Sequence, residues 1–272
     1  MEGSLEVQFA NSALQYANEI VSEDKDVIFL DGDVRVHDLE KFSPKKRRMN
    51  GNFATTSLLA LAQFAEATIK QSNEIDNPSC FIGNKGNAKL IFNFGDMKNP
   101  LHQDLNASIQ LNQTPVFIAM SNLKDESITQ RTLAEFIEDF NDYVVALDKD
   151  GNEINQKVAI SSIRDMSIES QRSVSQSSED YKDTSSAFAS VEAKFKAATP
   201  AYLKFDIPAF NEIDNKVFIF RISVITSDDK IKLVLRCPKW DEVIESINIE
   251  FQERLAEILG PLGVKTFIGN WN

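Results

Sequence analysis

The sequence predicts an α+β fold in which antiparallel strand pairs pack against amphipathic helices. Two strand pairs are indicated over residues 80–94 and 217–237, where runs rich in β-forming residues flank a turn. Two helices are indicated over residues 127–140 and 241–259, where apolar residues recur every three or four positions. Because each element carries one apolar face, we expect the strand pairs and helices to bury those faces against one another.

The elements of the first half follow from local signals. The turn of the first strand pair is expected over residues 83–87, where two glycines tolerate positive φ. The helix over 127–140 is expected to begin with a capping box formed by Ser127 and Gln130. Apolar periodicity or short apolar runs predict three earlier elements: a helix over 5–21, a strand over 27–30 and a helix over 56–70.

The last third of the chain has the clearest pattern. Strict alternation of apolar and polar residues predicts the hairpin 217–237, with a four-residue loop over 227–230. Asp241 is expected to cap the helix 241–259, and a glycine and a proline end that helix. Residues 264–268 are expected to add one more strand.

The length of the chain fits one large domain or two modest ones. Of its 272 residues 42% are apolar, which suffices for a packed core without a disulfide or a metal. The polar stretch 148–153 is predicted to be a tight turn and the boundary between an N-terminal half, 1–150, and a C-terminal half, 151–272. It is not a calcium loop, because Gly151 stands at the fourth position where such a loop needs glycine at the sixth.

Residues 167–199 differ in composition from the rest of the C-terminal half. Eight serines fall between Ser167 and Ser186, with few large apolar residues among them. Such a segment cannot bury enough surface to offset its own conformational entropy. We therefore expect either a flexible loop or a long polar arm, a two-stranded projection that a second copy of the chain holds in place.

The charge of the chain limits its partners. Forty-one acidic residues against 29 basic ones give a net charge of −12, which repels phosphate backbones unless cations gather locally. They gather once, at Lys45, Lys46, Arg47 and Arg48. This run is a candidate binding site for a phosphate or an acidic partner; the simpler interpretation is a solvated loop that pairs with nearby acids.

Few residues offer catalytic chemistry. His102 and Asp104 lie in a loop-like segment where an enzyme could place an acid and a base, so both are candidate binding residues. No nucleophile elbow and no zinc-binding spacing occur, and neither a cofactor nor a metal is expected. An acidic helix face could hold Mg²⁺, but exposed acids are ordinarily just solvated; its residues are Glu135, Glu138 and Asp142.

The cysteines and the start of the chain indicate a compartment. Cys80 and Cys237 are far apart in sequence, which favours two reduced thiols. The first residues lack the basic start of a signal peptide, and no apolar run is long enough to span a membrane. We expect a cytoplasmic protein without a membrane partner.

Three stretches together resemble a known family. They are residues 91–96 continuing to His102 and Asp104, the helix segment 130–139, and the segment from Pro200 to the hairpin and closing helix. In this pattern the chain is similar to the YfdQ-like family of uncharacterised phage and prophage proteins. The resemblance implies a phage or prophage origin and residence in a bacterial cytoplasm, and it brings no reaction and no catalytic residues.

Three hypotheses for the function remain. The leading hypothesis is a non-enzymatic protein that acts through homo-oligomeric assembly into a ring or a shell. Viral shell proteins also carry long polar arms, so a viral-capsid-like fold is one form of this hypothesis. The alternative is an accessory of phage DNA metabolism or counter-defence that binds nucleic acid or a host protein through residues 45–48. The third is an enzyme that uses His102 and Asp104.

Overall fold

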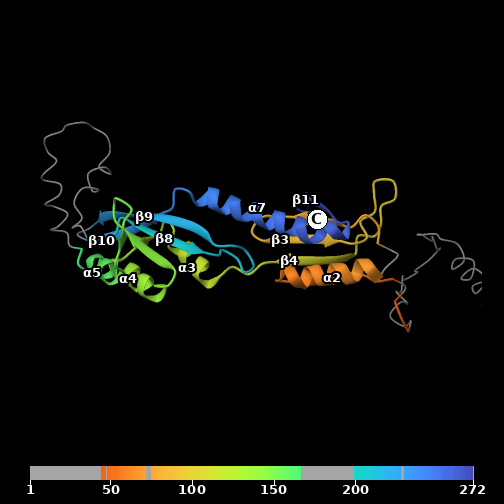
Figure 1. Ribbon diagram of the computed structural model, residues 1–272, viewed down its shortest axis with the longest axis horizontal. Helices are drawn as coiled ribbons and strands as arrows, with labels where there is room; N and C mark the ends of the chain where they lie inside the picture. The colour runs from red at the N-terminus through yellow and green to blue at the C-terminus, as the bar shows by residue number, and fades with distance from the viewer. Residues whose placement is uncertain (1–43, 47, 72–74, 167–198, 228–229, 272) are drawn as a thin grey trace, which may run out of the picture. The chain divides into compact units, whose positions relative to one another are not determined.

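The structure is a computed structural model that describes residues 44–46, 48–71, 75–166, 199–227 and 230–271. The predicted helix 5–21, the predicted strand 27–30 and the predicted arm, apart from Thr199, lie outside these ranges. Residues 50–272 form one compact unit, in which helices and two sheets confirm the α+β prediction. Figure 1 shows its elements.

The first sheet has five strands in the order β1-β4-β3-β2-β11. The outer pairs β1–β4 and β2–β11 are parallel, and the two inner pairs are antiparallel. The predicted strand pair 80–94 is present as β2 and β3, and the predicted last strand is present as β11. The strands are β1 (Gly51–Thr55), β2 (Ser79–Ile82), β3 (Asn87–Ile91), β4 (Leu105–Gln110) and β11 (Lys265–Ile268).

The second sheet has six strands in the order β5-β10-β9-β8-β6-β7, and all its pairs are antiparallel. It takes strands from both sides of residue 150, so the two predicted halves share this sheet. The strands are β5 (Ser127–Ile128), β6 (Val144–Leu147), β7 (Glu153–Ile154), β8 (Tyr202–Ile207), β9 (Lys216–Ser227) and β10 (Lys230–Arg236).

Each sheet has one face covered by helices. On the first sheet α2 contacts β1 and β4, and α7 contacts β11. On the second sheet α4 contacts β10, α5 contacts β6, and α7 contacts β9. None of the helices in the described ranges is long and apolar enough to cross a membrane. The helices are α2 (Leu58–Gln71), α3 (Pro115–Leu123), α4 (Gln130–Asp139), α5 (Gln156–Arg164) and α7 (Trp240–Leu259), which a short 3₁₀ turn, η3 (Gly260–Leu262), follows.

Among the described residues helices cover one face of the second sheet, and the alternation of β9 explains which face. Phe218 and Phe220 are fully buried, while their neighbours Val217 and Ile219 are 42% and 47% exposed. The ring of Trp240, at the start of α7, packs against both buried phenylalanines at 5.3 and 6.2 Å between centroids. The even-numbered side chains of β9 therefore face the helices, and the odd-numbered ones form what we call the outer face.

The structure corrects three local expectations. Helix α4 is capped by Thr129, whose hydroxyl accepts from the Thr132 N–H, and the predicted cap Ser127 lies in β5 instead. Helix α7 begins one residue before Asp241, so this carboxylate lies in the first turn of the helix and does not cap it. Its negative charge still interacts favourably with the positive end of the helix dipole. The hairpin ladder extends to the pair formed by Ser227 and Lys230, so the predicted four-residue loop is shorter.

Candidate functional site

The basic run predicted from the sequence is described in part. Lys45 and Lys46 are exposed and Arg48 is half-buried, while Arg47 lies outside the described residues. These residues belong to a unit separate from residues 50–272. The exposure of both lysines is compatible with a partner that carries negative charge.

His102 and Asp104 lie in the loop that leads from β3 to β4. His102 is exposed, and Asp104 is half-buried with its Oδ1 accepting a hydrogen bond from Asn93 Nδ2 at 3.0 Å. Asn93 Oδ1 in turn accepts from the backbone N–H of Leu105 at 3.1 Å. Asp104 thus helps to fix the loop at the start of β4, and its role in an enzyme stays a hypothesis.

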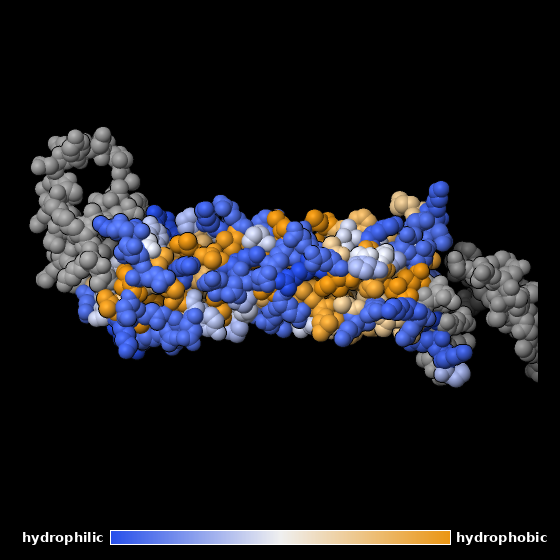
Figure 2. All heavy atoms as spheres, viewed as in Figure 1, coloured by the Kyte–Doolittle hydropathy of each residue, from blue (hydrophilic) through white to orange (hydrophobic). Residues whose placement is uncertain are grey.

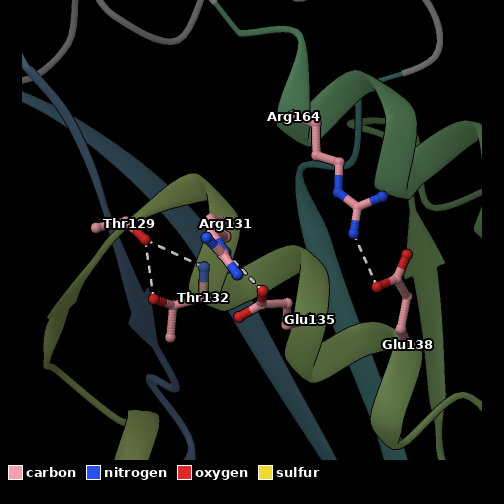
Figure 3. A network of polar contacts seen from close by, with 6 residues as sticks. All are labelled: Thr129, Arg131, Thr132, Glu135, Glu138 and Arg164. Atoms are coloured by element: carbon pink, nitrogen blue, oxygen red, sulfur yellow. Dashed lines mark hydrogen bonds and ion pairs between the residues drawn. The ribbon is translucent and has the colours of Figure 1, made fainter.

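The acidic face of α4 is occupied by ion pairs. Glu135 Oε1 lies 2.6 Å from Arg131 Nε, and Glu138 Oε2 lies 2.8 Å from Arg164 Nη2 of α5, as Figure 3 shows. Within the described ranges no three His, Cys, Asp or Glu side chains gather as a metal site would require. Glu138 therefore joins α4 to α5, whereas the pair of Glu135 and Arg131 lies within α4.

A hollow of about 580 Å³ opens beside this network. Gln130, one of its lining residues, is held in place because its Nε2 donates to the carbonyl oxygens of Ile163 and Met166 at 2.8 and 2.9 Å. Both guanidinium groups on its wall are paired with carboxylates, so their charges are compensated locally. The lining residues are Thr129, Gln130, Arg131, Glu135, Arg164 and Ile231.

The polar stretch 148–153 forms a tight turn, as predicted from the sequence. Asp148 Oδ1 accepts from the backbone N–H groups of Asp150 and Asn152, both at 2.8 Å. The side-chain hydrogen bond from Asn152, followed by those backbone bonds, holds the pKa of Asp148 below its usual value. The carboxylate therefore closes the hairpin of β6 and β7.

The outer face of the second sheet is basic, although the protein is acidic. Arg221 of β9 and Arg236 of β10 are direct cross-strand partners, and Tyr202 of β8 lies beside Arg221 in the same row. The pair places two positive charges directly opposite each other on this face. Over β8 to β10, the described side chains of this face include four bases and one acid: Lys204, Arg221, Lys232, Arg236 and Asp206.

Helix α7 presents the opposite charge. Arg254, its one basic residue, is held by Glu250 at 2.7 Å and by Asp214 at 2.6 Å. The exposed charged residues of α7 are all acidic, and hydrophilic residues lie over this helix in Figure 2. They are Asp241, Glu242, Glu245, Glu253 and Glu257.

Sequence reasoning missed this pair of charged surfaces. The alternation that predicted the hairpin also places Arg221 and Arg236 on the outer face. Placing them opposite each other, however, requires the register, which the loop length sets. The predicted loop 227–230, closed by Thr226 and Ile231, already implies the observed register, so the pairing of Arg221 with Arg236 follows from the predicted hairpin once its ladder is continued.

The family follows from comparison with known proteins. A model of uncharacterised conserved proteins, DUF2303, matches residues 2–271. The chain belongs to the DUF2303 family. No curated protein and no solved structure matches it.

Proposed function

We propose that this DUF2303 protein acts through assembly with copies of itself. In this assembly the basic outer face of the second sheet in one copy contacts the acidic face of α7 in the next copy. The observation that carries the proposal is the charge complementarity of these two surfaces on one chain. Complementary potentials steer association and fix which surfaces meet.

The start of α7 and the arginine row lie on opposite sides of the second sheet. The start of α7 packs on the covered face through Trp240, while the arginine row points away from the helices. A contact between two different surfaces of identical copies is heterologous, and repeating it produces a closed ring or an open filament. A ring is thus the simplest product, in line with the assembly expected from the sequence.

Apolar side chains among the bases give such a contact a source of binding energy. Val217, Ile219 and Ile225 are between 36% and 47% exposed on the outer face. Isolated exposed apolar residues are normal, but Val217 and Ile219 are successive outward residues of β9 and form a small patch that a partner would cover, while Ile225 lies apart from them beyond Arg221. The patch with its charged surroundings resembles an interface with an apolar centre and a polar rim.

The test is the molar mass in solution, measured by size-exclusion chromatography with light scattering at micromolar concentration. We expect an oligomer at low salt that dissociates as salt screens the contact, between about 0.05 and 0.5 M. The double variant Lys232→Glu, Arg236→Glu should be a monomer. The variant Lys157→Glu, a charge reversal half as large on an exposed residue of α5, should still assemble.

A second pair of variants makes the test specific. The change Glu242→Lys, Glu245→Lys should also give a monomer, because it removes the acidic side of the contact. Mixed with the Lys232→Glu, Arg236→Glu variant, it should assemble again with the two variants in equal numbers. The unchanged outer face of one variant meets the unchanged α7 of the other, and the two reversed surfaces also match. A wild-type protein that is monomeric at low salt would refute the proposal.

The phage or prophage origin and the bacterial cytoplasm remain part of the proposal. They are supported by the resemblance to the YfdQ-like family in residues 91–96 and 130–139. Fractionation of a bacterium that expresses the gene from its own promoter would test the location.

Binding of nucleic acid or of a host protein is the second candidate function. The exposed Lys45 and Lys46 support it, as does the arginine row of the outer face. Binding of a labelled single strand should then weaken with salt, and neutralising residues 45–48 should remove it. Retention of binding in that variant but not in Arg236→Glu would move the site to the sheet.

A further inference from the structure

The outer face of the first sheet carries a row of side chains that spans four strands. In this row Phe267 of β11 neighbours Phe81 of β2, which neighbours Lys89 of β3, which neighbours Ser108 of β4. The helices α2 and α7 cover the opposite face, where the alternate residues of β2 and β3, such as Cys80 and Leu90, are buried. The row therefore faces away from the helices.

Three rings of this face are stacked in series. Phe81 lies in the middle, with Phe267 at 5.4 Å and 19° on one side and Trp271 at 5.2 Å and 26° on the other. Phe94, in the loop after β3, packs edge-on against Trp271 at 5.1 Å and 73°. The outer two rings of the series remain open to solvent, since Phe267 is 47% and Trp271 is 42% exposed.

Hydrogen bonds hold this aromatic row in a fixed orientation. The indole N–H of Trp271 donates to Gln103 Oε1 at 3.0 Å. Gly269 N–H donates to the Ile82 carbonyl at 2.8 Å, which ties the segment before Trp271 to β2. Rings fixed before a ligand arrives bind it at a smaller cost in conformational entropy than mobile rings would.

The side chains beside the aromatic row are mainly neutral hydrogen-bonding groups. Asn52 Nδ2 donates to Ser108 Oγ at 3.0 Å, and Gln110 Nε2 donates to the Lys85 carbonyl at 3.0 Å. These bonds orient each amide on the sheet. The neutral polar residues of this face are Asn52, Asn87, Asn106, Ser108 and Gln110.

This combination specifies the chemistry of a ligand. Aromatic rings pack against flat, weakly polar surfaces, and amides and hydroxyls satisfy a ligand that both donates and accepts hydrogen bonds. A sugar ring has both features, with C–H groups on its faces and hydroxyls around its edge. A phosphate chain is disfavoured, because the protein carries a net charge of −12 and the described cations of this face are Lys89 and Lys265, the second of which is bonded to Asn77.

We propose that the outer face of the first sheet binds a neutral oligosaccharide, one sugar ring of which stacks on Phe267 or Trp271 while the neighbouring amides bond its hydroxyls. Ser79 and Ile91, at one end of this face, are buried, so further sugar units would extend over the polar residues of β3 and β4. This site lies on the face of the first sheet that points away from α7, and the basic half of the proposed contact between copies lies on the second sheet. Its success or failure is therefore independent of self-assembly.

Titration calorimetry with neutral sugar chains tests the proposal. The probes are β-1,4-linked hexasaccharides of glucose and of N-acetylglucosamine, with a twelve-residue oligothymidylate as the charged comparison. We expect one of the two sugars to bind, and Phe267→Ala and Trp271→Ala each to weaken it by about tenfold or more. Trp271→Phe, which keeps a ring, should bind more tightly than Trp271→Ala.

The matched control is Ile268→Ala, on the same strand and 75% exposed but in the alternate position of β11. It should bind like the wild type. Far-ultraviolet circular dichroism of each variant excludes loss of the fold as the cause. The proposal is overturned if neither sugar binds, if both alanine variants bind sugar as the wild type does, or if the oligothymidylate binds more tightly. If no sugar binds and Phe267→Ala also abolishes self-association, the occupant of this face is a second copy of the chain.

Discussion

Asn248 of α7 accepts a hydrogen bond from the backbone N–H of Lys85 at 3.1 Å, although the two residues are 163 positions apart. Lys85 has a positive φ of 61° in the turn between β2 and β3, and Asn248 is 7% exposed. The amide oxygen thus satisfies a donor that the tight turn leaves without a strand partner. Through this bond α7 fixes the turn of the first sheet.

Replacing Asn248 should therefore cost stability. In Asn248→Leu the Lys85 N–H loses its acceptor, and we expect a loss of about 1–3 kcal/mol in the free energy of unfolding. Urea denaturation followed by circular dichroism measures it. The neighbouring change Ile249→Ala, at a position 44% exposed, should cost less than Asn248→Leu; equal losses would contradict the role of the hydrogen bond.

Glu250 should make the stability depend on pH. Burial acts to raise the pKa of its carboxyl, but the hydrogen bond from the Asp214 N–H and the charge of Lys216, 2.8 Å away, outweigh burial and lower the pKa. A carboxyl with a lowered pKa in the folded state stabilises it above the unfolded pKa, and this stability is lost as the pH falls through the folded pKa. Acid titrations should show a steeper loss of stability in the wild type than in Glu250→Gln. Parallel curves would refute this prediction.

The two threonine caps should differ in their contribution. The hydroxyl of Thr114 accepts from the Phe117 N–H and also donates to the Pro208 carbonyl at 2.7 Å, in a site 7% exposed. Thr129 caps α4 in an exposed position. We expect Thr114→Ala to cost about 2 kcal/mol and Thr129→Ala about 1 kcal/mol or less. Thermal unfolding of both variants tests the order, which the reverse result would contradict.

The two thiols should be unreactive in the folded protein. Burial raises the pKa of Cys80 to about 12, and burial is also the largest cause of the raised pKa of Cys237. Because the thiolate is the reactive form, iodoacetamide at pH 8 should modify neither cysteine in buffer and both in urea. Mass spectrometry of the alkylated peptides distinguishes the two. Rapid labelling of Cys80 in buffer would show that the first sheet opens locally.

Local sequence signals predicted the helices and strands. The surfaces that these elements form together depend on how distant strands pair. Periodicity gave α7 and the β9–β10 hairpin because spacing alone determines which side chains share a face. No local signal could place Trp271 against Phe81, since that contact depends on β11 returning to β2 from the far end of the chain. The candidate residues His102 and Asp104 were found by residue type, and Gln103, which lies between them in the same loop, accepts the hydrogen bond from Trp271.

The pairing of β11 with β2 sets an order of events during synthesis. Residues 79–82 leave the ribosome long before residues 265–268, which complete the edge of their sheet. Until then the outer edge of β2 has no strand beside it and offers unpaired backbone groups to other nascent chains. A translation pause shortly before residue 265 should therefore increase aggregation, and chaperones that shield strand edges should be needed most in that interval.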